Sequence, residues 1–565
     1  MRRSALALTM VFLFTGFAAG ETHETKLAEI LTKNVKKNFT ALQQQETPPY
    51  YIAYRVDDEK SLTLSAESGA ISSRDEERDR ILTVMVRIGS PERDNFHPLR
   101  EDVSAYYTSQ GEQARLPYED DPEALSHIVR LATENAYRKA VARYSKVRAN
   151  LDVKVAEDDS SPDYAMPSPR VSFSAGSFSA PWPKLSSREK DLKRWSALFL
   201  RDPRCFSATA EIRLVRTEKT FVDTQGAAIV QDFSRARLSF EGMTKADDGM
   251  IIPVFLSFEG KSADDFPSRE IIFREVEKRA ALMEALRNAP LVEPYSGPAL
   301  LSGNAAGVFF HEIFGHRLEG QRMKEVTDSQ TFKDKIGEQV LPACFDVVFD
   351  PTRSRFQSRY LWGAYEYDDE GVRARSVTVV DMGTLKDFLM SRTPIQGHPV
   401  SNGHGRAQAG ALPVARQSNM FITVDTPLSE DALRERLVNE LKKEGKPFGY
   451  RIDEVQGGFT MTKRFTPNAF NVDPFIVYRV YADGRPDELV RGVDLIGTPL
   501  SMFSHIEAGG GEYGIFSGFC GAESGAVPVA AVAPEIFVSQ IELQKKGTSQ
   551  SKPPLLDRPD TREER

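Results

Sequence analysis

The sequence predicts an α+β fold, with an N-terminal α+β domain followed by a mainly antiparallel β domain that carries one buried helix. Hydrophobic residues at helical spacing predict amphipathic helices over 24–46, 123–147, 268–288 and 428–444. Runs of β-branched and aromatic residues between turn signals predict strands through most of the remaining chain. The helix expected over 304–317 is apolar on all sides, which is typical of a buried helix.

These elements divide the chain into four parts, over 1–20, 21–290, 291–544 and 545–565. Inside the first domain, several short strands are expected between 207 and 260. The segment 156–187 is rich in Ser, Pro, Asp and Gly and predicts a mobile, exposed loop. The tail after 545 is expected to be disordered because it is charged and contains adjacent prolines.

Composition excludes one class of partner. The chain has 565 residues, of which 40% are hydrophobic and 27% charged, as in ordinary globular proteins. Its net charge is -8 and its pI about 5.7. Nucleic acid is therefore not expected as a partner, because phosphate binding needs a basic surface.

The first twenty residues have the pattern of a secretory signal. Arg2 and Arg3 precede an apolar stretch over 5–17, and small residues follow over 18–20. The alternative, an uncleaved membrane anchor, is less favoured because a span needs about 20 apolar residues. We expect export to the periplasm or beyond, cleavage ahead of Glu21, and no stable membrane insertion afterwards.

Export makes the three cysteines informative, because an oxidising compartment favours disulfide pairing and an odd number leaves one over. A disulfide between Cys205 and Cys344 would leave Cys520 available for a metal. The alternative is that Cys205 and Cys344 are buried and reduced.

Near the middle of the chain lies the run His311-Glu312-Ile313-Phe314-Gly315-His316. The imidazoles of His311 and His316, with the thiolate of Cys520, are a donor set that favours zinc. Three protein ligands leave a fourth position for water, and the adjacent Glu312 is the candidate general base. The alternative is that both histidines are hydrogen-bonded core residues and Cys520 is a plain buried thiol.

The spacing of the two histidines predicts a distorted helix. They are five residues apart, which on an ideal helix separates their side chains by roughly 140°. A one-residue π-bulge would bring them together, and Gly315 stands where the chain can bend at little steric cost. Glu319, three residues after His316, is expected to orient a histidine.

Three further features carry weaker expectations. His404 and Arg406 lie in a loop flanked by glycines, where they either reach a substrate carbonyl or carboxylate or merely form part of a structural loop. The three glycines over 509–511 predict a flexible turn. His97 is expected to be a solvated surface residue.

The stretch 302–320, which contains His311-Glu312 and His316, resembles the TldD/PmbA family of metalloproteases. Three later segments resemble the family in the same order, over 401–416, 490–497 and 520–529. The resemblance implies zinc held by His311, His316 and Cys520, with Glu312 as catalyst. Because TldD-type subunits carry the motif and PmbA-type subunits lack it, the chain looks like the metal-bearing type.

The family also implies a substrate and a partner. The substrate would be a short peptide or unfolded protein, held in extended form against a strand edge. The partner would be a second copy or a paralogue, in a dimer that encloses the site. The alternative is a weakly catalytic or non-catalytic subunit that binds or matures peptides. Familiar members are cytoplasmic, so the expected export is a departure.

Overall fold

The computed structural model describes residues 25–99, 111–151, 159–166, 171–175, 182–325, 327–464 and 469–547. The predicted signal segment over 1–20 and the tail from 548 onward lie outside these residues, so both stay predictions. The described residues form two large sheets of eight and eleven strands with helices packed on them, which confirms the α+β class. None of the described helices is long and apolar enough to cross a bilayer.

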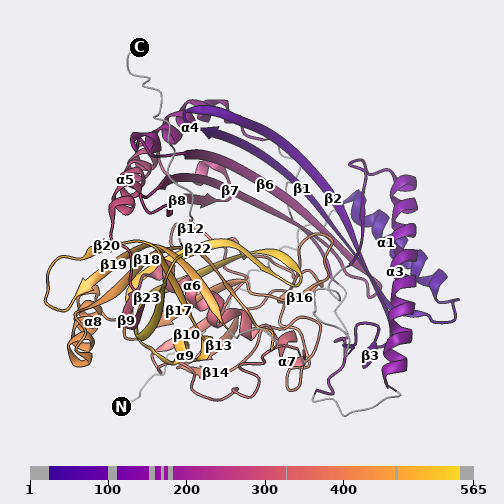
Figure 1. Ribbon diagram of the computed structural model, residues 1–565. Coiled ribbons are helices and arrows are strands. Elements are labelled where there is room, and N and C mark those ends of the chain that lie inside the picture. The colour runs from indigo at the N-terminus through magenta and orange to yellow at the C-terminus, as the bar shows by residue number, and fades with distance from the viewer. Residues whose placement is uncertain are drawn as a thin grey trace, which may run out of the picture.

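The N-terminal sheet is an arch of long antiparallel strands that curves over the C-terminal half of the chain (Figure 1). Its strands are β1 (Pro49–Glu67), β2 (Ala70–Ser90), β3 (Arg93–Asp94), β4 (Glu112–Arg115), β5 (Ser172–Ala175), β6 (Ser207–Asp223), β7 (Ala228–Lys245) and β8 (Ile251–Gly260). The prediction of short strands was wrong. The charged run over 57–60 looks like a break in the sequence, yet β1 continues through it and pairs with both β2 and β6.

Each end of the arch has its own hydrophobic core. At one end α1 (Lys26–Leu42) and α3 (Pro122–Leu151) pack on the sheet, and at the other α4 (Glu189–Ser196) and α5 (Arg269–Asn288) do so (Figure 1). Short 3-10 helices over 185–188, 197–201 and 263–265 join the second group. The amphipathic periodicity found in the sequence is thus the periodicity of helices that bury one face on a sheet.

The segment predicted to be a mobile loop is packed where it is described. Residues 172–175 pair with β7 as the parallel strand β5. Tyr164 is buried, with its ring centroid 5.1 Å from that of Tyr51. His97 is also buried, not solvated as predicted, and its Nδ1 lies 2.9 Å from a carboxylate oxygen of Asp163. A polar composition therefore concealed a segment held by specific contacts.

The C-terminal sheet is mixed but mainly antiparallel. Its strands are β9 (Tyr295–Leu301), β10 (Phe345–Phe349), β13 (Val377–Asp381), β14 (Thr384–Leu385), β17 (Asn419–Val424), β18 (Phe448–Thr460), β19 (Phe470–Tyr481), β20 (Glu488–Val490), β21 (Val493–Gly497), β22 (Ile506–Ala522) and β23 (Gly525–Lys545). Two small ribbons pair β11 (Arg355–Phe356) with β12 (Arg359–Tyr360) and β15 (Gly405–Arg406) with β16 (Val414–Ala415). The glycines over 509–511 lie within β22, so the predicted flexible turn was wrong.

Five helical segments accompany this sheet: α6 (Gly303–Ile313), a 3-10 helix (Gly315–Leu318), α7 (Gln321–Lys324), α8 (Glu430–Glu444) and α9 (Pro499–Ser504). Every residue of α6 except Asn304 is buried, as its all-round apolar sequence predicts. Helix α8 ends as predicted at Gly445, whose φ of 67° is readily adopted by glycine.

The three thiols occupy separate places. Cys205 packs at the core under α5, Cys344 packs at the core around α6, and Cys520 is buried on β22. Cys205 and Cys344 are not joined in a disulfide. Both thiols are partly buried, so the alternative of two buried, reduced thiols is met in the lack of pairing but not in the burial.

Helix α6 is seated on β22 through a contact between two glycines. A Cβ on Gly514 would lie 2.1 Å from the backbone nitrogen of Asn304, and a Cβ on Gly303 would lie 2.1 Å from the nitrogen of Gly514. Only the absence of both side chains allows the start of α6 to approach the strand this closely.

We therefore expect Gly514→Ala to lower the free energy of unfolding by about 1–3 kcal/mol, because the new methyl group meets backbone that cannot rotate away. Urea denaturation followed by circular dichroism measures the change. Gly521→Ala on the same strand is the matched control, since its Cβ would meet nothing within 4 Å. Equal stability of the two variants would contradict the packing argument.

Candidate metal centre

Helix α6 ends between the two histidines of the motif. The α-helical pattern stops at Ile313, Phe314 has φ -121° and ψ -55°, and a 3-10 helix begins at Gly315. This change of winding brings the ring centroids of His311 and His316 to 4.9 Å. The predicted distortion is present, but the predicted π-bulge is wrong, because the helix terminates instead of continuing through an extra residue.

Gly315 has a different role from the one predicted. Its φ lies outside the left-handed region. A Cβ on this residue would lie 2.0 Å from the side-chain oxygen of Gln417. That amide also donates to the carbonyl of His311 at 3.3 Å. Gly315 therefore makes room for a buried side chain that holds the end of α6.

His311, His316 and Cys520 form one buried group, which we call the His–His–Cys cluster. One ligand atom from each lies within 4.8 Å of the others, and Cys520 Sγ lies 3.4 Å from His316 Nε2. Ligands around a tetrahedral zinc ion lie about 3.3–3.6 Å apart, given its usual bond lengths. The donor set and its spacing thus fit zinc with small adjustments of the side chains.

The charges around the cluster favour a thiolate. Burial alone would raise the pKa of Cys520, but His316 and then Arg416 outweigh it and lower that pKa well below its usual range. Burial would lower the pKa of His316, yet Cys520 and Glu319 raise it well above normal. The thiol is therefore prepared to act as an anionic ligand, and metal binding would release the proton held by the imidazole.

Glu319 and two arginines surround the cluster. A carboxylate oxygen of Glu319 lies 3.3 Å from His316 Nδ1, which leaves Nε2 directed at the thiol. Arg322 contacts Glu319 at 2.7 Å, and Arg416 donates to Cys520 Sγ at 3.2 Å and to its carbonyl at 2.5 Å. The expected place of Glu319 beside His316 is thus observed, although the helix does not continue to it.

Arg322 and Arg416 were missed as members of this site. Both are buried, but an arginine in a sequence gives no sign of whether its charge faces solvent. The available signal was that Arg416 belongs to one of the segments quoted for the family resemblance.

Glu312 faces the same space as the cluster. Burial raises its pKa, opposed in part by His311 and His316. Gly458 of β18 packs directly against it, since a Cβ there would lie 2.8 Å from Glu312 Cγ. A desolvated carboxylate held beside two imidazoles is a stronger base than one in water.

The cluster borders a cavity of about 340 Å³, which we call the cluster cavity. Its walls come from α6, β18 and β22, and Glu312, Gly458 and Phe519 are among its lining residues. Phe459 and Phe519 both line this cavity, and the two residues are 56% and 52% exposed overall. The site therefore combines donor atoms with an accessible apolar wall.

His404 and Arg406 are not part of this cavity. His404 is fully buried, with Nε2 3.1 Å from Ser418 Oγ and Nδ1 3.1 Å from Asn402 Oδ1. It belongs to the structural loop that the alternative interpretation described. Arg406 lines a second cavity, between the arch and the C-terminal sheet.

Comparison with known proteins agrees with this geometry. Residues 294–545 match the family model described as the PmbA/TldA metallopeptidase C-terminal domain. This match and the curated relatives support membership of the TldD/PmbA family.

Two curated relatives show how far their sequences differ from this chain. A metalloprotease of Methanothermobacter thermautotrophicus is 26% identical over 59% of this chain and 68% of its own length. A zinc metalloprotease TldD homolog of Saccharolobus solfataricus is 25% identical over 58% of this chain and 68% of its own. TldE from Thermococcus kodakarensis shares the fold with a TM-score of 0.61 at 16% identity, covering 92% of this chain and 100% of that one.

His404 gives a test of which histidines are structural. Burial, with a smaller effect of Arg406, lowers its pKa to about 3. In the unfolded chain His404 binds a proton below about pH 6.5, whereas in the folded protein it stays neutral down to about pH 3. The free energy of unfolding therefore decreases as the pH is lowered through this range. Between pH 7 and 5, the wild type should lose about 2 kcal/mol more unfolding free energy than His404→Gln.

Urea unfolding at several pH values measures this difference in slope. His127→Gln, at an exposed position, should keep the wild-type profile. Parallel profiles for the wild type and His404→Gln would show that His404 is not held neutral.

Proposed function

We propose that this protein is a zinc-dependent peptidase that hydrolyses short or unfolded peptides held in extended form. The observation that carries the proposal is the convergence of Glu312 and the His–His–Cys cluster on one cavity. The metallopeptidase family model and the names of the relatives support the same chemistry.

The form of the substrate is suggested by two strands beside the cluster. Among the described residues, 458–460 of β18 pair only with β19, and 516–522 of β22 pair only with β23. Both segments line the cluster cavity. A peptide entering between them could add as a further strand, bound largely through its backbone, as in β-augmentation. Such binding excludes folded proteins and demands little of the peptide's sequence.

In the proposed mechanism His311, His316 and Cys520 hold the zinc ion. When bound, the ion would lower the pKa of water and polarise the substrate carbonyl. The Glu312 carboxylate accepts the proton of the attacking water and passes it to the nitrogen of the leaving amine. Glu319 holds His316 Nδ1, and Arg416 holds the backbone of Cys520, so both fix the donors in place.

Export and pairing belong to this proposal as predictions. An exported peptidase would meet peptides in the periplasm or outside the cell. A dimer, with a second copy or a paralogue, would enclose the cluster cavity further. If the wild type binds zinc and peptides but releases no fragments, the peptide-binding or maturation subunit becomes the better description.

Replacement of the proposed base tests the chemistry. We expect Glu312→Gln to lower the rate of peptide cleavage by roughly 10²–10⁴-fold, because the amide cannot accept a proton. Mass spectrometry of a denatured peptide pool, with the zinc content of both proteins measured in parallel, provides the readout. Retained cleavage in a zinc-loaded variant would disprove the role of Glu312.

Replacement of the proposed thiolate ligand tests the metal site. We expect Cys520→Ala to weaken zinc binding more than about 100-fold, since loss of even an outer partner commonly weakens it 10- to 100-fold. Competition with a chelating dye measures the affinity. Cys344→Ala is the matched control because its thiol packs against the core around α6 and is not one of the grouped donor atoms. Equal zinc affinity of the two variants would remove Cys520 from the ligand set.

A further inference from the structure

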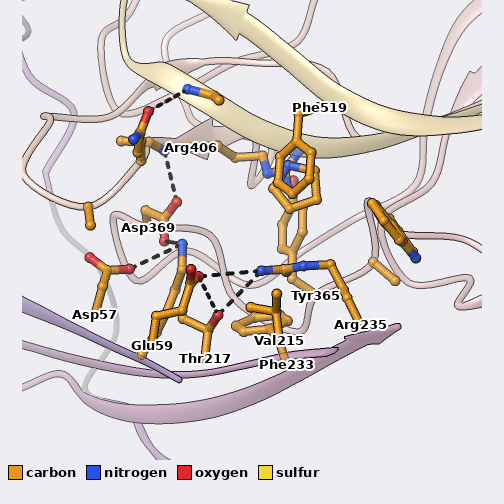
Figure 2. Close-up of a pocket in the computed structure, with 18 of the residues that line it drawn as sticks. Asp57, Glu59, Val215, Thr217, Phe233, Arg235, Tyr365, Asp369, Arg406 and Phe519 are labelled. Atoms are coloured by element: carbon orange, nitrogen blue, oxygen red, sulfur yellow. Dashed lines mark hydrogen bonds and ion pairs between the residues drawn. The ribbon is translucent and has the colours of Figure 1, made fainter. Parts of the chain in front are cut away.

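A second cavity of about 490 Å³ lies beneath the arch, between the N-terminal strands and the C-terminal half of the chain (Figure 2). We call it the arch cavity. One wall of this cavity is a face of the arch strands β1, β2, β6 and β7, because the lining residues alternate along each strand. They include Asp57, Glu59, Arg213, Val215, Thr217, Lys219, Phe233, Arg235 and Arg237.

The carboxylates of this cavity already have partners. Lys219 lies 2.7 Å from Asp369 and 3.6 Å from Asp57, and Asp57 is also held by Arg55 at 2.8 Å. Asp368 accepts backbone hydrogen bonds, among them one from Gly405 at 2.9 Å. Asp57 and Asp369 are thus already paired with Arg55 and Lys219 and do little to neutralise the other arginines.

The arginines, in contrast, are poorly compensated. Arg235 lies along this wall, where it donates to Thr217 at 3.3 Å and is 3.8 Å from the half-exposed Glu59 (Figure 2), a separation long enough that the ion pair contributes little. Its Nε has no hydrogen-bond partner among the described residues. Arg406 donates to the carbonyl of Gln417 and is within 4 Å of no carboxylate among the described residues, although Asp369 is near enough to raise its pKa in part.

Like charges also face one another here. Arg213 and Arg237 stand directly opposite on β6 and β7, and Glu259 on β8 pairs with Arg237 at 3.4 Å. Burial lowers the pKa of Arg235 and of Arg406, and Arg406 lowers that of Arg235 further. The guanidinium groups of Arg235 and Arg406 therefore repel each other, and both would stabilise an anion bound in the space between them.

Phe519 connects this space to the metal centre, because it borders both cavities. Adjacent residues of a strand point to opposite faces, so Phe519 faces the arch while Cys520 faces the cluster. The ring of Phe519 lies 5.8 Å from Arg235 and 5.7 Å from the ring of Trp362. A peptide that added as a strand along β22 would therefore direct alternate side chains toward the cluster and toward the arginines.

We propose that the arch cavity is a substrate subsite in which Arg235 and Arg406 bind a carboxylate of the peptide. This inference rests on the proposed peptidase function. The carboxylate is either an acidic side chain near the scissile bond or the C-terminus of the peptide, since guanidinium groups bind both alike.

Peptide binding to zinc-loaded Glu312→Gln protein tests the subsite without requiring turnover. Fluorescence anisotropy would compare four labelled peptides of one sequence: a neutral amide, one with a central Glu, one with a free C-terminus and one with a central Lys. We expect at least one acidic form to bind roughly ten- to hundred-fold more tightly than the neutral amide. Preference for the central Glu or the free C-terminus identifies the source of the carboxylate.

Adding Arg235→Glu should remove the acidic preference and create one for the Lys peptide, which an unfolded protein cannot show. Arg235→Lys should keep a weaker acidic preference. Arg74→Glu, on the same sheet with a 61% exposed side chain, is the control and should leave all affinities unchanged. Equal binding of acidic and neutral peptides, or an equal loss for all four in Arg235→Glu, would overturn the subsite.

Cleavage by the wild type separates this inference from the function on which it rests. Cleavage without acidic preference removes the subsite and keeps the peptidase. Selective binding without cleavage keeps the subsite and removes the peptidase. Failure of all four peptides to bind removes both.

Discussion

The carboxylate of Glu319 joins the separate chain segments that make up the metal centre. It contacts His316 Nδ1 at 3.3 Å, Arg322 at 2.7 Å and the Nε of Arg416 at 3.4 Å. Arg416 in turn binds the backbone of Cys520, 104 residues further along the chain. Removing the carboxylate would take away the ion-pair partner of the buried Arg416, whereas Arg322 would keep Asp328 and Glu523. Leaving a buried guanidinium group without its carboxylate is far more unfavourable than losing an exposed ion pair. The positions of both histidine and thiol therefore depend on this one residue.

Much of the fold could be predicted because its signals are local. The helices α1, α3, α5 and α8 lie within a few residues of the predicted ranges, since each buries one face and its periodicity is visible in a short window. The long arch strands could not be predicted in full. Their charged middles face a cavity instead of a core, so β1 looks interrupted at the residues that line the arch cavity. For the same reason, three glycines in β22 resemble a turn although they provide close contacts such as that of Gly509 with Val424.

The candidate site divides in the same way. His311, Glu312 and His316 are close in the sequence, and their chemistry alone suggested a common role. Cys520 required the further argument that zinc favours sulfur, together with the family resemblance. The arginines required the structure, because a buried and a solvated arginine look identical in a sequence. His404 illustrates the converse error, since a histidine between glycines resembles a reactive group but is hydrogen-bonded on both ring nitrogens.

The hairpin of β22 and β23 lies between the two sheets and borders both cavities. Cys520 and its cross-strand neighbour Val527 face α6, whereas Phe519 and its neighbour Pro528 face the arch. The same hairpin therefore forms part of the wall of both cavities, and the alternation of side chains along β22 places the residues that line one cavity next to those that line the other. The N-terminal domain supplies no member of the His–His–Cys cluster, but its strands complete a charged surface on the reverse of the strand that bears the thiol. A peptide that adds as a strand along β22 directs alternate side chains to the two faces of the hairpin. The N-terminal sheet can therefore influence which peptides bind at the cluster, although it carries no catalytic residue.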